Sequence, residues 1–334
     1  MKKSLIYLFS LLCMLTLVTS CSDDEKGGTD DAWKEISKDY TSDKLSIGTV
    51  STSGTISVNA ASADKATIIL NNVVAGESSV SVDATLTKTD AGYAFEGEST
   101  ATTCNVKVSG TIENGKLTAA ISRTLTSALA GTLNLNYVPY MNDMQIAQAH
   151  ALFNTGDAQM DAMLNGMAAP VVGQLIAKEV ESVTVNLGEE GTFSFSFKKV
   201  GASEETVMPP AKLQEMIKSY LTWYEKENVL YLAVHKDALT ILSGLNILPE
   251  NIDLETILGL LTVEGDYYTI PLQVKEEDGL TTIYLNKDIL VKAWEVAKPL
   301  VGNIQDETIQ SILAMVDQVM AKAKEIEFGL VFKK

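Results

Sequence analysis

The sequence predicts an α+β protein in which an N-terminal antiparallel β-sandwich or barrel is followed by an antiparallel sheet packed by helices. Between residues 44 and 138, short runs alternate apolar and polar residues and are separated by Gly, Asn or Asp. Over residues 139–334, strand-like runs are interspersed with runs at helical spacing. The chain of 334 residues is long enough for two hydrophobic cores. We therefore expect an all-β domain over 44–138 and an α+β domain over 139–334.

Residues 1–20 have the layout of an export signal. Lys2 and Lys3 precede a mostly apolar run over residues 5–17. A membrane-spanning helix needs roughly 20 apolar residues, so this run is too short to remain as a transmembrane anchor. We expect residues 1–20 to be removed as a signal peptide.

The end of this signal resembles the lipobox of bacterial lipoproteins. Small and apolar residues over 18–20 lead directly to Cys21. The resemblance implies that the Cys21 sulfur receives a diacylglycerol, that acyl chains such as palmitate anchor the protein, and that Cys21 becomes the first residue after cleavage. An ordinary secreted thiol is the alternative. Several acyl chains would hold the protein on a membrane without help from the folded part.

The residues that follow Cys21 carry information about the cellular location of the protein. Ser22 fits the sorting pattern of outer-membrane lipoproteins, and the acidic residues 23–25 resemble the export tag of surface lipoproteins in Bacteroidota. The resemblance implies an outer-membrane protein facing the cell exterior. A solvated acidic linker, with a periplasmic orientation, is the alternative. Residues 21–43 are polar and acidic, which predicts a flexible tether.

Charge and cysteine content exclude several classes of protein. The formal net charge is −17, which would repel phosphate backbones, so we expect no nucleic-acid partner. Cys104 is the only cysteine after residue 21, so no intrachain disulfide is expected in the folded part. Cys104 lies in a strand-like run and is predicted to be a small buried core residue.

Seven runs predict the strands of the β domain. They cover residues 55–60, 66–74, 79–88, 93–100, 104–110, 116–122 and 132–138. Asn114–Gly115 predicts a two-residue hairpin loop, because both positions of such a turn need positive φ. A second hairpin is expected around Asp90–Gly92. This pattern resembles the calycin-like domains, and other domains of unknown function, in lipoproteins of Bacteroidota. The resemblance implies a small barrel or a curved sheet, without an established activity.

The second domain begins with helical spacing. Residues 138–153 and 157–180 both show it, and the second run carries a stripe with Met160, Met163 and Met167 until Pro170 interrupts or kinks it. Strands are then expected over 182–188 and 191–200 around a tight turn. Phe193, Phe195 and Phe197 share one strand face, which we expect the neighbouring helices to cover.

The remaining elements follow in the same way. Helices are expected over 209–224, in two short pieces within 239–261, and over 287–300 and 306–324. Strands are expected over 228–237 and 325–334, with a hairpin over 266–286 that turns at Glu277–Gly279.

Catalytic signatures are scarce. The sequence lacks histidine pairs at metal spacing, CxxC clusters, a GxSxG elbow and a glycine-rich phosphate loop, so no metal, cofactor or catalytic residue is predicted. Pairs of acidic residues are frequent, which makes a glycoside hydrolase the least improbable activity, but the pairs fall in expected turns. His150 and His235 are interpreted as structural residues.

Two groups of side chains are candidates for binding. Trp223 and Tyr224 are the best candidates for stacking against sugar rings. The stripe of Met160, Met163 and Met167 would adapt to an apolar ligand. We therefore expect a non-catalytic binding module for a glycan or protein at the cell surface. The alternative is a carrier that holds a lipid or another apolar small molecule in a cavity lined by Met, Leu and Phe.

Overall fold

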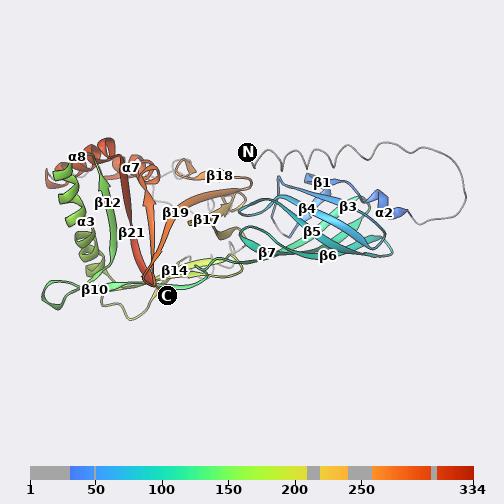
Figure 1. Cartoon of the computed structure of the whole chain (residues 1–334), viewed down its shortest axis with the longest axis horizontal. Helices are drawn as coiled ribbons and strands as arrows, with labels where there is room; N and C mark the ends of the chain where they lie inside the picture. The colour runs from blue at the N-terminus through green and yellow to red at the C-terminus, as the bar shows by residue number, and fades with distance from the viewer. Residues whose placement is uncertain (1–30, 49, 209–218, 240–257, 302–306) are drawn as a thin grey trace, which may run out of the picture. The chain divides into compact units, whose positions relative to one another are not determined.

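The computed structural model describes residues 31–48, 50–208, 219–239, 258–301 and 307–334, whose fold is drawn in Figure 1. Two large, mainly antiparallel sheets dominate, and the longer helices accompany the second sheet. This confirms the predicted α+β class. None of the helices in the described part of the chain is long and apolar enough to cross a membrane.

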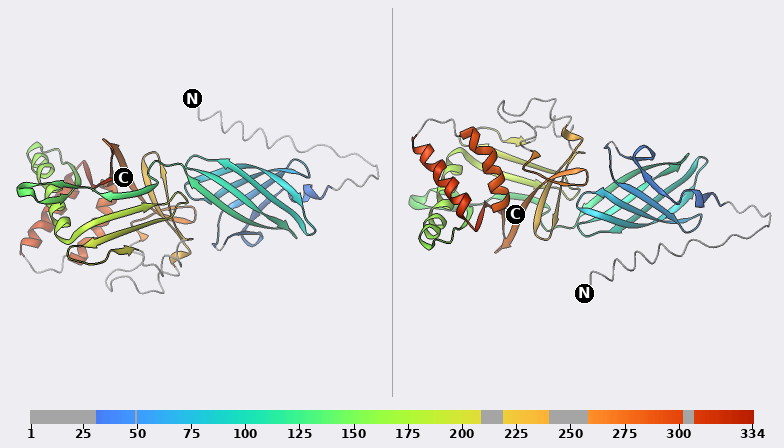
Figure 2. Two further views of the ribbon diagram at one scale, coloured as in Figure 1. Left: turned by 90° about the horizontal axis from the view of Figure 1, so that it is seen from below. Right: turned by 90° about the horizontal axis from the view of Figure 1, so that it is seen from above.

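The first sheet has eight strands and curves until it is nearly closed, as the two views of Figure 2 show. In spatial order its strands are β1 (Asp39–Thr41), β3 (Thr55–Ala60), β4 (Lys65–Val74), β5 (Glu77–Lys88), β6 (Gly92–Thr100), β7 (Cys104–Glu113), β8 (Lys116–Leu125) and β2 (Leu45–Ile47). Neighbouring strands are antiparallel, except that β2 runs parallel to β8. Alternate residues of each long strand are buried, so apolar side chains fill the concave side.

The expected hairpins of this sheet are present. Asn114 and Gly115 have φ of 51° and 74° and join β7 to β8, with Glu113 paired to Lys116. These values fit the two-residue turn that the Asn-Gly pair predicts. The β5–β6 hairpin also lies where expected, since β5 ends at Lys88 and β6 begins at Gly92.

The ordered chain begins earlier than the polar composition predicts. Helix α2 (Ala32–Glu35) and strand β1 lie within residues 21–43, which were expected to form a flexible tether. Strand β1 pairs with β3, and the fully buried Tyr40 donates its hydroxyl to the carbonyl oxygen of Ile36 at 3.1 Å. The tether prediction is therefore wrong over residues 32–43, because two apolar side chains in a polar stretch are sufficient to dock it. Residues 21–30 lie outside the described part.

The second sheet has eleven strands. Along its main path these are β15 (Thr206–Met208), β14 (Phe193–Lys199), β13 (Val180–Leu187), β9 (Gly131–Leu135), β21 (Glu325–Lys333), β20 (Leu280–Asn286), β19 (Tyr267–Glu277), β17 (Val229–His235) and β16 (Leu221–Lys226). Strand β12 (Ala149–Asn154) also pairs with β21, and β18 (Thr262–Glu264) with β19. The β19–β20 turn has Asp278 and Gly279 at positive φ, as predicted for the Glu277–Gly279 hairpin.

Strand β9 is not part of the first sheet. The sequence predicts it as the seventh strand of the β domain, but it pairs with β13 and β21. Its alternation of apolar and polar residues was recognised correctly. Its partners could not be inferred, because alternation identifies a strand face without naming the neighbouring strand.

The predicted helix over 138–153 is wrong. This segment forms β10 (Tyr137–Pro139), a short 3-10 turn, β11 (Gln145–Ala147) and β12. Strand β12 pairs with β21 along its whole length, from Ala149 opposite Leu330 to Asn154 opposite Glu325. Long-range pairing with β21 overrides the local helix preference of the Ala and Met residues.

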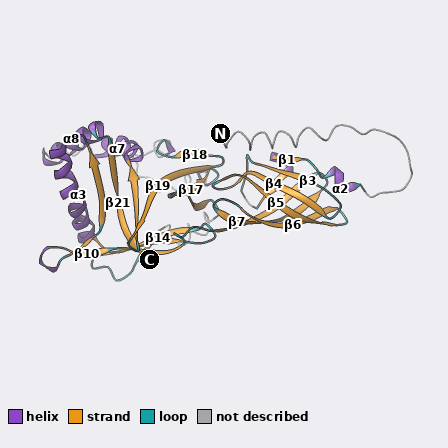
Figure 3. Cartoon of the chain, viewed as in Figure 1, coloured by secondary structure: helices purple, strands orange, loops and turns teal. Residues whose placement is uncertain are grey.

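Three long helices accompany the second sheet: α3 (Ala158–Glu179), α7 (Lys287–Val301) and α8 (Glu307–Lys322). Helix α3 packs on β11 and β12, and α7 packs on β20 and β21, on the side where Figure 3 shows the helices together. Asp157 caps α3 by accepting from the amides of Gln159 and Met160. Pro170 lies inside α3 and does not end it.

Two other helical predictions need correction or lie out of reach. The expected helix over 209–224 is wrong at its end, because Leu221–Lys226 is strand β16. Residues 209–218 and 240–257 lie outside the described part, including most of the two short helices expected within 239–261.

The phenylalanine face of β14 is only partly covered, since Phe195 is 41% exposed and Ser196 is the buried residue.

A single main hydrophobic core runs from the first sheet into the second. It contains first-sheet residues such as Val74 and Leu125 and second-sheet residues such as Leu133, Trp223 and Leu230. The two sheets therefore share buried apolar surface at their junction. Cys104 belongs to this core with 0% exposure, as predicted.

Candidate functional site

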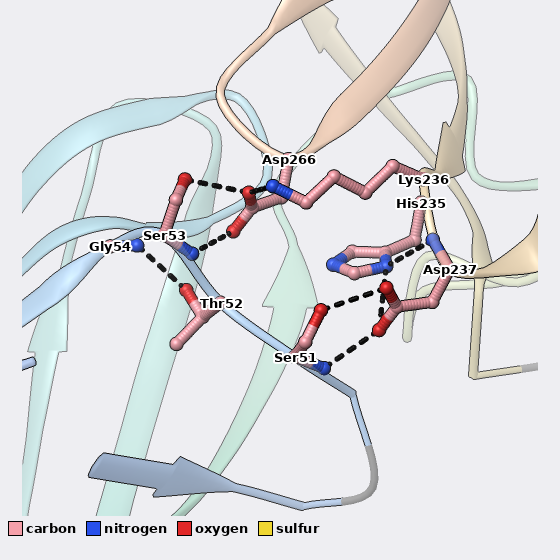
Figure 4. Close-up of polar contacts among 8 residues, drawn as sticks. All are labelled: Ser51, Thr52, Ser53, Gly54, His235, Lys236, Asp237 and Asp266. Carbon is pink, nitrogen blue, oxygen red and sulfur yellow. Dashed lines mark hydrogen bonds and ion pairs between the residues drawn. The ribbon is translucent and has the colours of Figure 1, made fainter. Parts of the chain in front are cut away.

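Two serine–aspartate pairs, which we call the serine–aspartate clasp, connect the loop after β2 to the second sheet (Figure 4). Ser51 donates its amide to Oδ2 of Asp237 and its hydroxyl to Oδ1, both at 2.8 Å. Ser53 does the same to Asp266, at 2.7 and 2.6 Å. Each serine therefore holds both oxygens of one carboxylate, which fixes the loop against the β17 and β19 ends.

Asp266 is the buried centre of the clasp. It is 3% exposed, and Lys236 Nζ donates to its Oδ1. Burial by itself would raise the pKa of Asp266, but the hydrogen bonds from Lys236 and Ser53 outweigh this effect and lower the pKa to about 2. The carboxylate is thus ionised and fully occupied by its neighbours.

His235 lies between the clasp and the aromatic side chains of the junction. Its Nδ1 is 3.2 Å from the amide nitrogen of Asp237, and its ring meets Tyr267 nearly edge-on at 5.1 Å. The side chain is 2% exposed, and burial lowers its pKa although the charges of Asp237 and Asp266 oppose that shift. A buried neutral imidazole at the end of a strand agrees with the structural role expected for His235.

A cavity of about 660 Å³ lies beside the clasp, between β8 and β16. Its apolar lining comes from Ile47, Val50, Val73, Val74, Ala75, Ala120, Ile121 and Leu221. Its polar lining includes Arg123, Thr124, Glu190, Thr192, Ser219, Thr222 and Tyr267. Smaller cavities of about 230 and 20 Å³ lie nearby, and Tyr267 forms part of the wall of all three.

Arg123 is the only arginine in the chain, and it stands at this cavity. Its Nη1 donates to the Ala75 carbonyl at 2.9 Å, and its Nη2 donates to Thr222 Oγ1 and, at 3.1 Å, to the Trp223 carbonyl. Burial lowers its pKa, although the nearby Tyr267, Cys104, Tyr224 and Glu77 act in the opposite direction. The guanidinium thus links the first sheet to β16 through neutral acceptors.

A tight hairpin turn lies directly against Arg123. The Gly191 carbonyl accepts from the Trp223 amide at 2.9 Å and from Thr222 Oγ1 at 3.0 Å. Gly191 has φ of 84°, and a Cβ there would lie 2.5 Å from Arg123 Nη2. Only glycine suits both the backbone and the space at this position.

Neither histidine is placed to activate a nucleophile. His150 Nε2 lies 2.7 Å from Glu327 Oε2, and His235 accepts the Asp237 amide, so neither histidine is bonded to a hydroxyl or thiol. His150 lies on β12 and not on the expected helix. Within the described ranges, no group of three His, Cys, Asp or Glu residues is arranged to hold a metal ion. The geometry offers hydrogen-bond donors, the half-buried cation of Arg123 and apolar walls.

Trp223 and Tyr224 do not form an exposed stacking surface. Trp223 is 0% exposed and donates Nε1 to the Gly188 carbonyl at 2.9 Å. Tyr224 is 1% exposed, stacks on Tyr231 at 4.9 Å and donates its hydroxyl to Glu264 at 2.5 Å. Burial, together with Glu264, raises the Tyr224 pKa. Both rings belong to the junction core, although they lie next to the cavities.

The three methionines lie on α3, away from the cavities. Met163 and Met167 are 50% and 59% exposed, and Met160 is half-buried. None of the three lines the cavities described above. Of the predicted binding residues, only Tyr224 lines one of these cavities, the one of about 230 Å³, and Cys21 lies outside the described residues.

Sequence reasoning did not single out Arg123, although a signal was present. Leu117, Ala119, Ile121 and Leu125 occupy the inward series of β8, and Arg123 continues that series. A single arginine at a position where alternation calls for an apolar residue marks a departure from the pattern. The clasp had no comparable signal, because Ser51 and Ser53 lie far from Asp237 and Asp266 in the sequence.

Comparison of the chain with protein-family models, with curated proteins and with solved structures finds no match. The site must therefore be interpreted from its own geometry.

Proposed function

We propose that this chain is a non-catalytic binding protein that holds a small organic molecule in the 660 Å³ cavity between β8 and β16. The observation that carries the proposal is the cavity itself. Its volume lies within the range of about 300–1,000 Å³ typical of small-molecule sites, and its lining combines apolar walls with a few polar groups. This is closer to the carrier alternative than to a glycan platform.

Surface exposure supports the same choice. Among the large hydrophobic side chains of the described residues that are well exposed, Phe195 is the only aromatic one. A glycan platform would depend on exposed aromatic faces. The cavity lining is made of branched aliphatic and polar residues, and it includes no Met or Phe.

The experiment blocks the cavity. Ala120 lines it from an exposed position on β8, so Ala120→Trp adds a large ring to the cavity lining at a position outside the buried core. Thr118→Trp, at an exposed position on the same strand that does not line the cavity, is the matched control. Protein purified from its own host would be examined by native mass spectrometry for bound small molecules.

We expect bound ligand in the wild type and in Thr118→Trp and its loss in Ala120→Trp. Retention of the ligand by Ala120→Trp would place binding elsewhere and reject the proposal. Absence of any bound molecule from the wild type, together with no thermal stabilisation by a metabolite library, would also reject it.

We further propose that the protein is a lipoprotein acylated at Cys21 and displayed on the outer membrane towards the cell exterior. The signal-like residues 1–20 and the lipobox resemblance support this proposal. Metabolic labelling with an alkyne palmitate analogue is expected to label the wild type and Cys104→Ala but not Cys21→Ser. Labelling of Cys21→Ser would contradict the anchor. Protection of the protein from added protease on intact cells would contradict exterior display.

A further inference from the structure

Arg123 occupies a position that belongs to the core of the first sheet. It lies opposite Val106 in the β7–β8 pairing, and Val106 is 1% exposed. Its neighbours in the inward series, Ile121 and Leu125, are apolar. A charged side chain here forgoes apolar burial, and burying a cation is costly unless an anion compensates it.

No carboxylate in the described part of the chain compensates Arg123 directly. Its three hydrogen bonds all end on neutral oxygens. Glu77, the acidic residue that acts on it through space, instead accepts from the amide and hydroxyl of Thr103 at 2.6 and 2.8 Å. Glu190 lines the same cavity but forms no ion pair with Arg123. The positive charge therefore faces the cavity without a matching negative charge.

The guanidinium retains donors for a ligand. Arginine has five N–H donors in a planar fork that suits a carboxylate, and the three bonds to protein leave two of them. Thr222 and Tyr267 add polar groups beside the fork, while Ile47, Val73 and Ile121 supply apolar wall. A molecule with one anionic end and an apolar body matches both parts of the lining.

We propose that the ligand of this cavity is a small organic carboxylate whose anionic group pairs with Arg123, an inference that rests on the proposed binding function. Arg123 sets the required charge, and the aliphatic wall sets the preference for an apolar body. A neutral molecule of the same shape would leave the half-buried guanidinium uncompensated.

The first test compares acids with their primary amides on the unchanged protein. The probes are octanoate and 3-phenylpropionate, each paired with its amide, and affinity is measured by calorimetry. We expect each acid to bind at least tenfold more tightly than its amide. Equal affinity of acid and amide would overturn the carboxylate inference while leaving the cavity proposal intact.

The second test changes the charge at residue 123. Arg123→Gln keeps hydrogen-bond donors and loses the charge, and Arg123→Lys restores the charge. We expect Arg123→Gln to lower the affinity for the acids at least tenfold without lowering the affinity for the amides. Arg123→Lys is expected to recover part of the lost affinity. Unchanged acid affinity in Arg123→Gln would overturn the inference.

Two further measurements separate the possible failures. Ala120→Trp is expected to abolish acid and amide binding together; if acids still bind it, the cavity proposal fails. If no probe binds, the molecule co-purified from the host decides the inference: an anion that Arg123→Gln loses supports it, and a neutral molecule overturns it. Octyl phosphate and octyl sulfonate serve as comparison anions, and tighter binding of either than of octanoate would reject the carboxylate assignment.

Discussion

Ser53 and Asp266 share two hydrogen bonds across the junction of the two sheets, one from the serine amide and one from its hydroxyl. Because one residue supplies both donors, the pair fixes backbone and side chain together. Ser51 and Asp237 repeat the arrangement nearby. The wall of the cavity next to β2 is therefore held by polar contacts, in addition to the shared core.

Asp266→Asn is expected to destabilise the protein by about 1–3 kcal/mol, because it removes a charged acceptor from a buried network. Asp43→Asn is the control, since Asp43 is exposed and has no hydrogen bond or ion pair among the described residues. Urea denaturation followed by circular dichroism measures both. If the free energy of unfolding falls no further in Asp266→Asn than in the control, the serine–aspartate clasp does not contribute to stability.

The carboxylate of Asp266 also makes the stability of the folded protein depend on pH. The pKa of Asp266 is about 2 in the folded protein, below the ordinary value of 3.8, so its contribution to stability is complete above about pH 5 and is lost progressively as the pH falls through 3.8 towards 2. Asp266→Asn is expected to flatten the stability curve in this window. Identical acid unfolding curves for variant and wild type would contradict the assignment.

The pKa of His235 predicts a second pH range in which the stability of the protein changes. Burial holds its pKa below the ordinary value of 6.5, so the unfolded chain binds a proton more readily and stability falls as pH decreases below 6.5. In a His150→Gln background, NMR of the remaining histidine is expected to show a titration midpoint below 6.5. A midpoint at or above 6.5 would mean that Asp237 and Asp266 outweigh burial.

Two glycines of α3 are expected to respond oppositely to alanine. At Gly166 a Cβ would meet nothing within 4 Å, so Gly166→Ala should stabilise by about 0.5–1 kcal/mol through better helix propensity. At Gly173 a Cβ would lie 2.2 Å from the Ala147 carbonyl oxygen, so Gly173→Ala should destabilise. Thermal unfolding compares the pair. The same sign for both would show that α3 does not pack on β11 as described.

Cys104 is expected to be chemically inert in the folded protein. It is 0% exposed, and burial raises its pKa, so little thiolate is available. In a chain that begins at residue 31, Ellman's reagent should react slowly under native conditions and rapidly in urea. Rapid native labelling would contradict its place in the core.

The sequence was most informative where structure is local. The Asn114–Gly115 hairpin, the turn at Glu277–Gly279 and the helix over 287–300 could all be predicted, because turn chemistry and periodicity act within a few residues. The segment over 138–153 could not, because its conformation depends on β21. Strand identity could likewise be predicted for β9, but its sheet could not.

The candidate site was less accessible to prediction. Trp223 and Tyr224 are buried in the core at the junction, and only Tyr224 lines a cavity, since large aromatic side chains gain most from burial. Met163 and Met167 have helical spacing but face outward. Arg123 could be noticed only by following the inward series of β8 past Ile121. The cavity depends on the packing of two sheets, which no local pattern encodes.

The position of β21 has a consequence for how the protein is made. Strand β21 pairs with β9, β12 and β20, so it lies inside the second sheet and not at an edge. While the ribosome has yet to add residues 325–333, β9 and β20 lack the neighbour that joins them. Before that point the strands can form only two separate groups, β9 with β13–β15 and β20 with β16, β17 and β19, so the two groups become one continuous sheet only when the last strand of the chain has been made.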